Sequence, residues 1–185
     1  HPWLAEGAGR VPVVVGAGRL TRQKDFLTLV EAFAALRDRQ PARLIIFGEG
    51  PERQRLEDRA DELGVADAVD LPGRVPDLLP FVARADVFAL SSRYEGLGNV
   101  LIEAMAAGTP AVSTDCPHGP AEILEAGRYG RLVPVGDVAM LAEALAATLA
   151  QPTSPEMLAE AVDRFRAGPV AEQYLALMGL NGDRR

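Results

Sequence analysis

Short apolar segments alternate with longer amphipathic ones along this chain, and that order restricts the possible folds more than any other feature. The apolar segments are uninterrupted, which is typical of strands that are covered on both faces of a parallel sheet. Between them, apolar residues recur at helical spacing. The apolar segments are residues 11–15, 43–47, 69–71, 86–90, 110–113 and 132–133. The helical patterns are residues 26–36, 52–63, 99–107, 138–149, 155–165 and 170–178. This succession predicts an α/β fold, a Rossmann-like doubly wound parallel sheet with helices on both faces.

Length, charge and cysteine content exclude several classes of protein. The 185 residues carry 26 acidic and 19 basic side chains, and the net charge of −7 disfavours general nucleic-acid binding. A single cysteine, Cys116, excludes an intrachain disulfide, and two histidines leave little for a zinc site. No apolar run reaches the roughly 18 residues of a membrane-spanning helix. We therefore expect a cytoplasmic protein, with any peripheral contact at the inner face of the membrane made by the full-length protein.

The loop after the first strand carries two glycines and two cations. In doubly wound sheets, ligands bind at the carboxyl ends of the strands, so such loops are the candidate sites. Gly16-Ala17-Gly18 suggests a dinucleotide site, but Thr21 stands where the third glycine of that fingerprint belongs, and no Gly-Lys-Ser/Thr follows. Arg19 offers a planar fork of donors and Lys24 a compact point charge, which together suit a diphosphate. The alternative is that both are solvated surface cations.

The loop after the fourth strand combines glycines with two glutamates. Gly96 and Gly98 let backbone N–H groups approach a ligand, and the helix expected from Asn99 adds positive potential that favours phosphate. Glu95 precedes this helix and Glu103 lies about one turn inside it. Two carboxylates beside a phosphate site make sense if each accepts hydrogen bonds from vicinal hydroxyls of a ribose or sugar ring. Alternatively, they only complement the helix dipole.

The loop after the fifth strand holds the single cysteine and one of the two histidines. His118 could contact a ligand, although a histidine in a surface loop is more often a bystander. We expect Cys116 to be a small, semi-buried filler and not a nucleophile, because nothing nearby in the sequence would lower the pKa of its thiol.

Taken in order, these loops resemble one family. The motifs that carry the resemblance are Gly18-Arg19-Leu20 with Lys24-Asp25, Phe47-Gly48-Glu49-Gly50-Pro51-Glu52, Leu71-Pro72-Gly73-Arg74-Val75, and Glu95-x7-Glu103 followed by Ala104-Met105-Ala106-Ala107-Gly108-Thr109-Pro110. Together they resemble the carboxyl-terminal, donor-binding domain of the family-4 retaining glycosyltransferases, which have the two-domain GT-B fold. The resemblance spans roughly residues 11 to 178. Each motif is loose by itself, and the specificity comes from their order at the expected strand ends.

The resemblance implies a role for each matching position. Arg19 and Lys24 match the pair that holds the donor diphosphate, and Glu95 matches the glutamate that contacts the donor sugar's hydroxyls. These three are the implied catalytic residues, and Glu103 matches the glutamate that grips the ribose diol. The other implied donor-binding residues are Gly18 in the first loop, Arg74 and Val75 at the base, Gly96, Leu97 and Gly98 along the sugar, and Asn99 and Val100 at the phosphates.

The resemblance also implies a reaction and a donor. Members of the family transfer a sugar from a nucleotide diphosphate to an acceptor hydroxyl with retention of configuration, in glycan and surface-polysaccharide assembly. The loop at residues 116–120 is similar to that of members that use UDP-sugars, so we expect a UDP-sugar before GDP-mannose. We expect neither metal nor cofactor, because cationic side chains neutralise the diphosphate and no Asp-x-Asp motif occurs.

One departure concerns the second domain of the family, which binds the acceptor and is absent here. The resemblance predicts a linker remnant over residues 1–10, the donor-binding domain over 11–168, and a C-terminal helix over 169–185 that crosses back to the missing domain. We expect the fragment to be inactive by itself, and Trp3 and the last helix to have lost their packing partners. Two alternatives are a stand-alone nucleotide-binding module and a fragment of a dinucleotide-dependent oxidoreductase.

Overall fold

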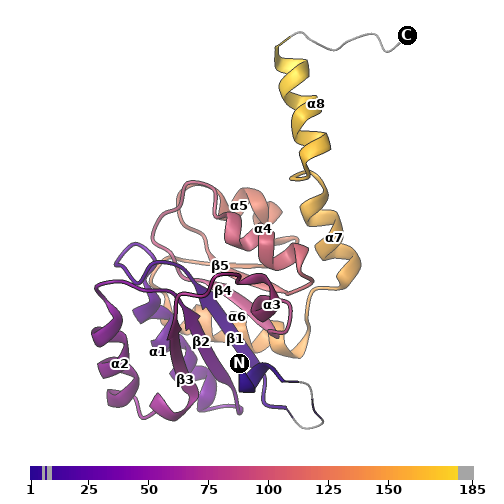
Figure 1. The fold of residues 1–185 in the computed structure, drawn as a ribbon. Helices are drawn as coiled ribbons and strands as arrows, with labels where there is room; N and C mark the ends of the chain where they lie inside the picture. The colour runs from indigo at the N-terminus through magenta and orange to yellow at the C-terminus, as the bar shows by residue number, and fades with distance from the viewer. Residues whose placement is uncertain (6, 8–9, 179–185) are drawn as a thin grey trace.

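The computed structural model describes residues 1–5, 7 and 10–178, which form one six-stranded sheet with helices on both sides (Figure 1). All neighbouring strands are parallel. The spatial order is β3-β2-β1-β4-β5-β6, which is the doubly wound arrangement that the sequence predicted. The strands are β1 (Val13–Ala17), β2 (Arg43–Phe47), β3 (Val69–Gly73), β4 (Val87–Leu90), β5 (Ala111–Thr114) and β6 (Arg131–Val133).

Two hydrophobic layers explain why the strand segments are apolar at every position. Val14 of β1 points into the layer beneath α1, α2 and α6, whereas its neighbours Val13 and Val15 point into the layer beneath α4 and α7. Because both faces of the sheet are covered, alternation with polar residues is lost. The helices are α1 (Phe26–Arg37), α2 (Arg53–Glu62), α3 (Leu79–Val82), α4 (Asn99–Ala106), α5 (Pro120–Ile123), α6 (Val138–Ala150), α7 (Pro155–Asp163) and α8 (Ala167–Leu177).

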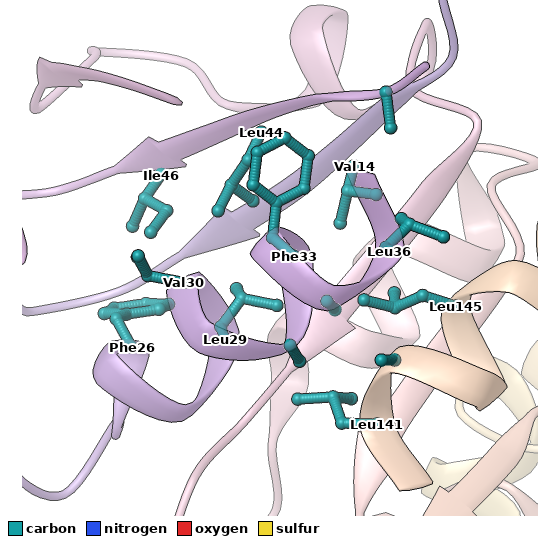
Figure 2. Packing of buried hydrophobic residues seen from close by; sticks show 14 of the residues in the cluster. Val14, Phe26, Leu29, Val30, Phe33, Leu36, Leu44, Ile46, Leu141 and Leu145 are labelled. Carbon is teal, nitrogen blue, oxygen red and sulfur yellow. The ribbon is translucent and has the colours of Figure 1, made fainter. Parts of the chain in front are cut away.

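The core between the sheet and α1 is closely packed. Figure 2 shows Phe33 and Leu29 of α1 facing Leu44 and Ile46 of β2, and all four side chains are fully buried. We expect Ile46→Val to lower the free energy of unfolding by about 1 kcal/mol, because it removes one buried methylene and leaves a small cavity. That corresponds to a fall of about 2–4 °C in Tm, measurable by calorimetry.

A surface control separates this packing effect from a general loss of stability. Val135 is 38% exposed in the loop after β6, so Val135→Ala should change the Tm little. Equal losses for the two variants would contradict the packing argument.

The predicted boundaries differ from the observed ones in a few places. β1 begins at Val13 and continues through Gly16 to Ala17, so the prediction of residues 11–15 is about two residues early. Gly16 lies inside the strand, and a Cβ there would lie only 3.0 Å from Leu29 of α1. This glycine therefore allows close packing of the helix and does not mark the end of the strand. The four-residue helix α3 was not predicted, because so short a segment has no apolar periodicity.

The beginning of the chain packs against the domain, contrary to the expectation for Trp3. Its ring lies under the Arg43 guanidinium, 4.9 Å away, and next to the His1 ring. His1 in turn contacts Asp70 at 2.6 Å, and Leu4 is buried in the core. The expectation of an orphaned Trp3 was wrong because Arg43, the first residue of β2, offers it a cation. Residues 6, 8 and 9 of the predicted linker lie outside the described residues.

The last described helix extends away from the body of the domain (Figure 1). Its exposed large apolar side chains include Tyr174, Leu175 and Leu177, the last at 86% exposure. The apolar side of α8 is therefore open, and its crossing to another domain stays a prediction. Residues 179–185 of the predicted C-terminal segment lie outside the described residues. Within the described ranges, no helix combines the length and the apolar character needed to cross a membrane.

Candidate functional site

The strand order directs attention to the carboxyl ends of β1 and β4. These strands are neighbours, but the chain continues from β1 to β2 on one side and from β4 to β5 on the other. Such a switch point leaves a crevice between the two loops that follow the strands, where ligands of doubly wound proteins bind. Here the loops are residues 18–25 and 91–98, which carry most of the predicted site residues.

Three hydrogen bonds to backbone carbonyls tie these two loops into one unit. The Ser91 hydroxyl donates to the Lys24 carbonyl at 2.8 Å. The Arg93 N–H donates to the Gln23 carbonyl at 2.8 Å, and the Gln23 side-chain amide donates to the Tyr94 carbonyl at 3.0 Å. Because the contacts join residues about 70 positions apart, the loop conformations depend on each other.

Two of the three predicted catalytic groups, Lys24 and Glu95, bind one another directly. Lys24 Nζ lies 2.5 Å from Glu95 Oε1, and the side chains are 18% and 8% exposed. The hydroxyl of the buried Ser92 donates to the same oxygen at 2.6 Å. In this state the ammonium is shared with a carboxylate, so a bound diphosphate would compete with Glu95 for Lys24.

The backbone immediately after Lys24 has an unusual conformation. The next residue, Asp25, precedes α1 in the left-handed region with φ of 46°. Its buried carboxylate accepts a hydrogen bond from Thr28 at 3.0 Å and pairs with Arg93 at 3.1 Å. Short polar residues tolerate this conformation best, and these two partners hold it in place. Asp25 therefore supports the position of Lys24, a function that the sequence analysis did not assign.

Two adjoining depressions at the carboxyl edge collect the predicted residues. They share Ala17, Gly18 and Leu78, and their volumes are about 450 and 480 Å³. The sugar-side depression, our name for the smaller one, is lined by Lys24, Glu95, Leu97, Gly98, Asn99, Val100 and Glu103. The base-side depression is lined by Arg19, Phe47, Gly48, Glu49, Arg74 and Val75. Of the predicted site residues, only Gly96 lines neither; it is exposed in the loop beside them.

Leu78 lines both depressions and was missed by the sequence analysis. It immediately precedes α3, the helix too short to leave a periodic signal. Ser92 was missed as well, although its position three residues before Glu95 is a readable signal. A serine hydroxyl at that spacing can reach back to a carboxylate in the same turn.

Tight backbone packing shapes the base-side depression. Gly48 has φ of +144°, and a Cβ there would lie 1.8 Å from the Gly18 carbonyl oxygen. The Gly18 N–H donates to the Phe47 carbonyl at 2.9 Å, and the Gly48 N–H donates to the Gly73 carbonyl at 2.9 Å. The loops after β1, β2 and β3 are thus joined through glycine backbone, which only a residue without a side chain permits.

The cations of the site differ in how they are engaged. The side chains of Arg19 and Arg74 are exposed and have no hydrogen-bond or ion-pair partner among residues 1–5, 7 and 10–178. In the sugar-side depression, α4 begins after Gly98, which has φ of +87°, and no side chain caps the helix. Two unengaged guanidinium groups and an uncapped helix start are suitable partners for an anionic ligand.

The loop after β5 contributes packing. Cys116 is 3% exposed, and burial raises the pKa of its thiol, so the sulfur stays protonated and poorly nucleophilic near neutral pH. His118 is exposed with φ of 65° and lines neither depression. Gly119 approaches the other loop closely, since a Cβ there would lie 1.8 Å from the Leu97 carbonyl oxygen.

A third depression, of about 460 Å³, lies behind the loop after β1. Four of its charged groups are paired, Arg55 with Glu52 at 2.8 Å and Arg93 with Asp25 at 3.1 Å, and Arg22 lines it as well. None of the predicted site residues lines it. In the part of the chain that the structure describes, no three His, Cys, Asp or Glu side chains gather as metal ligands would.

Fold and site together define a Rossmann-like domain with an anion-suited crevice at its switch point. The profile of the family described as Glycosyl transferases group 1 matches residues 6–165. The chain therefore belongs to the group 1 glycosyl transferases, and it has the GT-B type of fold seen in solved members. This membership favours a transferase over the oxidoreductase alternative.

Relatives and solved structures agree with this assignment. The chain is 38% identical over 172 residues to the lipopolysaccharide core biosynthesis glycosyltransferase LpsE of Rhizobium meliloti, covering 90% of this chain and 49% of LpsE. It is 37% identical over 156 residues to a GDP-mannose-dependent α-(1-6)-phosphatidylinositol monomannoside mannosyltransferase of Mycolicibacterium smegmatis, covering 79% and 41%. HepE of Anabaena in complex with UDP superposes with a TM-score of 0.82 at 26% identity, covering 91% and 49%. The chain thus spans about half the length of such relatives or less.

Proposed function

We propose that this chain binds the nucleotide diphosphate sugar of a retaining glycosyltransferase that builds a glycan or surface polysaccharide. The observation that carries the proposal is the convergence of Lys24, Glu95, Glu103 and the α4 start on one depression, beside a second one with Arg19 and Arg74. A diphosphate is bound by cations and by helix N–H groups, and the diols of a ribose and a sugar donate hydrogen bonds to carboxylates. Membership in the group 1 family supports the same conclusion.

The donor would lie across both depressions. In this arrangement Arg19 and Lys24 bind the diphosphate near Gly18, where the two depressions meet. Arg74 and Val75 border the base, whereas Glu95 with the 96–98 turn borders the sugar. Glu103 accepts hydrogen bonds from the ribose diol. The N–H groups of Asn99 and Val100 at the start of α4 point toward the phosphates.

We further propose a UDP-sugar as the donor, ahead of GDP-mannose. The HepE structure contains UDP and supports uridine. The mycobacterial relative is named for GDP-mannose and supports the alternative. Comparing UDP with GDP in one titration distinguishes a UDP-sugar from GDP-mannose as the donor.

In the proposed reaction the sugar–phosphate bond breaks through an oxocarbenium-like transition state while negative charge grows on the leaving diphosphate. Arg19 and Lys24 stabilise this charge electrostatically, so that the protein's own cations do the neutralising without a metal. The acceptor hydroxyl attacks from the face that the diphosphate leaves, and the leaving phosphate takes its proton. The sugar therefore keeps its anomeric configuration. The acceptor would be bound by a second domain, and the chain alone would bind donor without transferring it.

A thermal-shift titration of the 185-residue chain with UDP, GDP, ADP and NAD tests the proposal. A ligand at 100 times its Kd adds about 2.7 kcal/mol to the free energy of unfolding. For a domain of this size the Tm should rise by roughly 5–10 °C. We expect this rise with UDP, a smaller one with GDP, and none with NAD.

Two results would argue against the proposal. A shift with NAD alone would favour a dinucleotide site, and equal shifts with all four compounds would indicate nonspecific anion binding. Glu103→Ala provides a specific check because it should reduce the response to UDP while leaving the ligand-free Tm nearly unchanged. Its side chain is exposed and has no hydrogen-bond partner among the described ranges.

A further inference from the structure

The hydrogen bonds to Glu95 are unevenly distributed between its two oxygens. Oε1 accepts from both Lys24 at 2.5 Å and Ser92 at 2.6 Å. No hydrogen bond to Oε2 occurs within residues 1–5, 7 and 10–178, and Glu95 lines the sugar-side depression. Oε2 is therefore the oxygen that is available to the hydroxyls of a bound sugar.

The two groups that donate to Oε1 differ in mobility and in competing demands. Lys24 has a long side chain that lines the depression, and a diphosphate would draw its ammonium away from the carboxylate. Ser92 has a single side-chain torsion and is fully buried. A ligand can therefore displace Lys24 but cannot reach Ser92.

The backbone of Ser92 is itself fixed by the next strand. Its carbonyl accepts a hydrogen bond of 2.6 Å from the hydroxyl of Thr114, which ends β5 and is fully buried. The following residue, Arg93, donates its N–H to Gln23 in the neighbouring loop. The Ser92 hydroxyl is thus a donor in a position determined by the rigid sheet.

From these contacts we infer that Ser92 is a positioning residue for sugar recognition. When the diphosphate takes Lys24, Ser92 continues to hold Oε1 and keeps Oε2 directed at the sugar. The inference rests on the proposed function, since it assumes that Glu95 receives the sugar's hydroxyls. It separates two steps: the nucleotide engages Lys24, whereas discrimination of the sugar depends on Ser92 through Glu95.

The test compares binding of UDP with binding of a UDP-sugar to Ser92→Ala. Isothermal titration calorimetry would be performed on the 185-residue chain with UDP, UDP-glucose, UDP-galactose, UDP-N-acetylglucosamine and GDP-mannose. The nucleotide sugar that binds the unmodified chain most tightly serves as the probe. We expect Ser92→Ala to weaken that probe about tenfold, the effect of losing one hydrogen bond to a charged group, and to leave the Kd of the free nucleotide within about twofold.

Three variants make the comparison specific. Ser92→Thr keeps the hydroxyl and should restore most of the affinity for the nucleotide sugar. Thr114→Val removes the hydrogen bond to the Ser92 carbonyl and should weaken the nucleotide sugar selectively, to a smaller extent. Ser113→Ala deletes an equally buried hydroxyl that bonds the Thr114 carbonyl at 2.9 Å, and should change neither affinity.

The possible outcomes distinguish this inference from the proposed function. Equal weakening of nucleotide and nucleotide sugar in Ser92→Ala would show a purely structural role and overturn the inference, as would no change in either. If the unmodified chain binds UDP but no nucleotide sugar more tightly, the sugar role of Glu95 fails and the inference fails with it, while the nucleotide site stands. If it binds no nucleotide at all, the proposed function itself is wrong.

Discussion

Replacing Lys24 with methionine is expected to abolish the stabilisation of this chain by UDP and to destabilise the ligand-free fold. The ammonium is the cation that lies inside the sugar-side depression, and a methionine of similar length cannot neutralise a diphosphate. The substitution also leaves the Glu95 carboxylate, which is 8% exposed, without its counter-ion. We expect the free energy of unfolding to fall by about 2 kcal/mol, measured by denaturant titration. In a protein that also contains the acceptor domain, the transfer rate should fall about 100- to 1000-fold.

Two further variants separate the loss of the phosphate ligand from the loss of the ion pair. The double variant Lys24→Met with Glu95→Gln removes both charges, so it should recover much of the stability but none of the response to UDP. Glu95→Gln alone keeps Lys24 and removes its competitor, so UDP should bind at least as tightly as to the unmodified chain. A Lys24→Met chain that still responds fully to UDP would refute the assignment of Lys24 to the diphosphate.

Replacing Gly48 with alanine is expected to destabilise this domain strongly. The new Cβ would lie 1.8 Å from the Gly18 carbonyl oxygen, and neither a Cβ nor a backbone oxygen can rotate away. The residue also has φ of +144°, a conformation that side chains rarely adopt. Clash and strain together should lower the free energy of unfolding by about 3 kcal/mol or more, and the Tm by about 6–12 °C. Because Gly18 and Gly48 both line the base-side depression, UDP binding should be lost as well.

Gly64 is the matched control for this substitution. It also has a positive φ, of +68°, but a Cβ there would meet no atom within 4 Å. Gly64→Ala should therefore cost only the conformational strain, about 1 kcal/mol, and leave UDP binding intact. Similar losses for the two variants would show that backbone strain, and not the contact with Gly18, determines the effect at Gly48.

The strands and most helices could be predicted because their signals are local. The run Leu44-Ile45-Ile46-Phe47 is apolar on both faces of the sheet, and any fold that buries both faces produces such a run. The strand-to-helix loops follow from the same pattern, and with them the candidate residues Arg19, Lys24, Glu95 and Glu103. Short elements were the exception, since the four residues of α3 are fewer than the window in which periodicity is detectable.

The sequence by itself determined which segments are strands, which loops lie at their carboxyl ends, and which charged side chains those loops carry. Only the tertiary structure decided that β1 lies next to β4, because strand order depends on packing between distant segments. That order brings Lys24 onto Glu95 across 71 positions of sequence, and the pairing of β1 with β2 sets Gly48 against Gly18. Such contacts have no local signal, since each is made between loops whose conformations exist only when the whole sheet has formed.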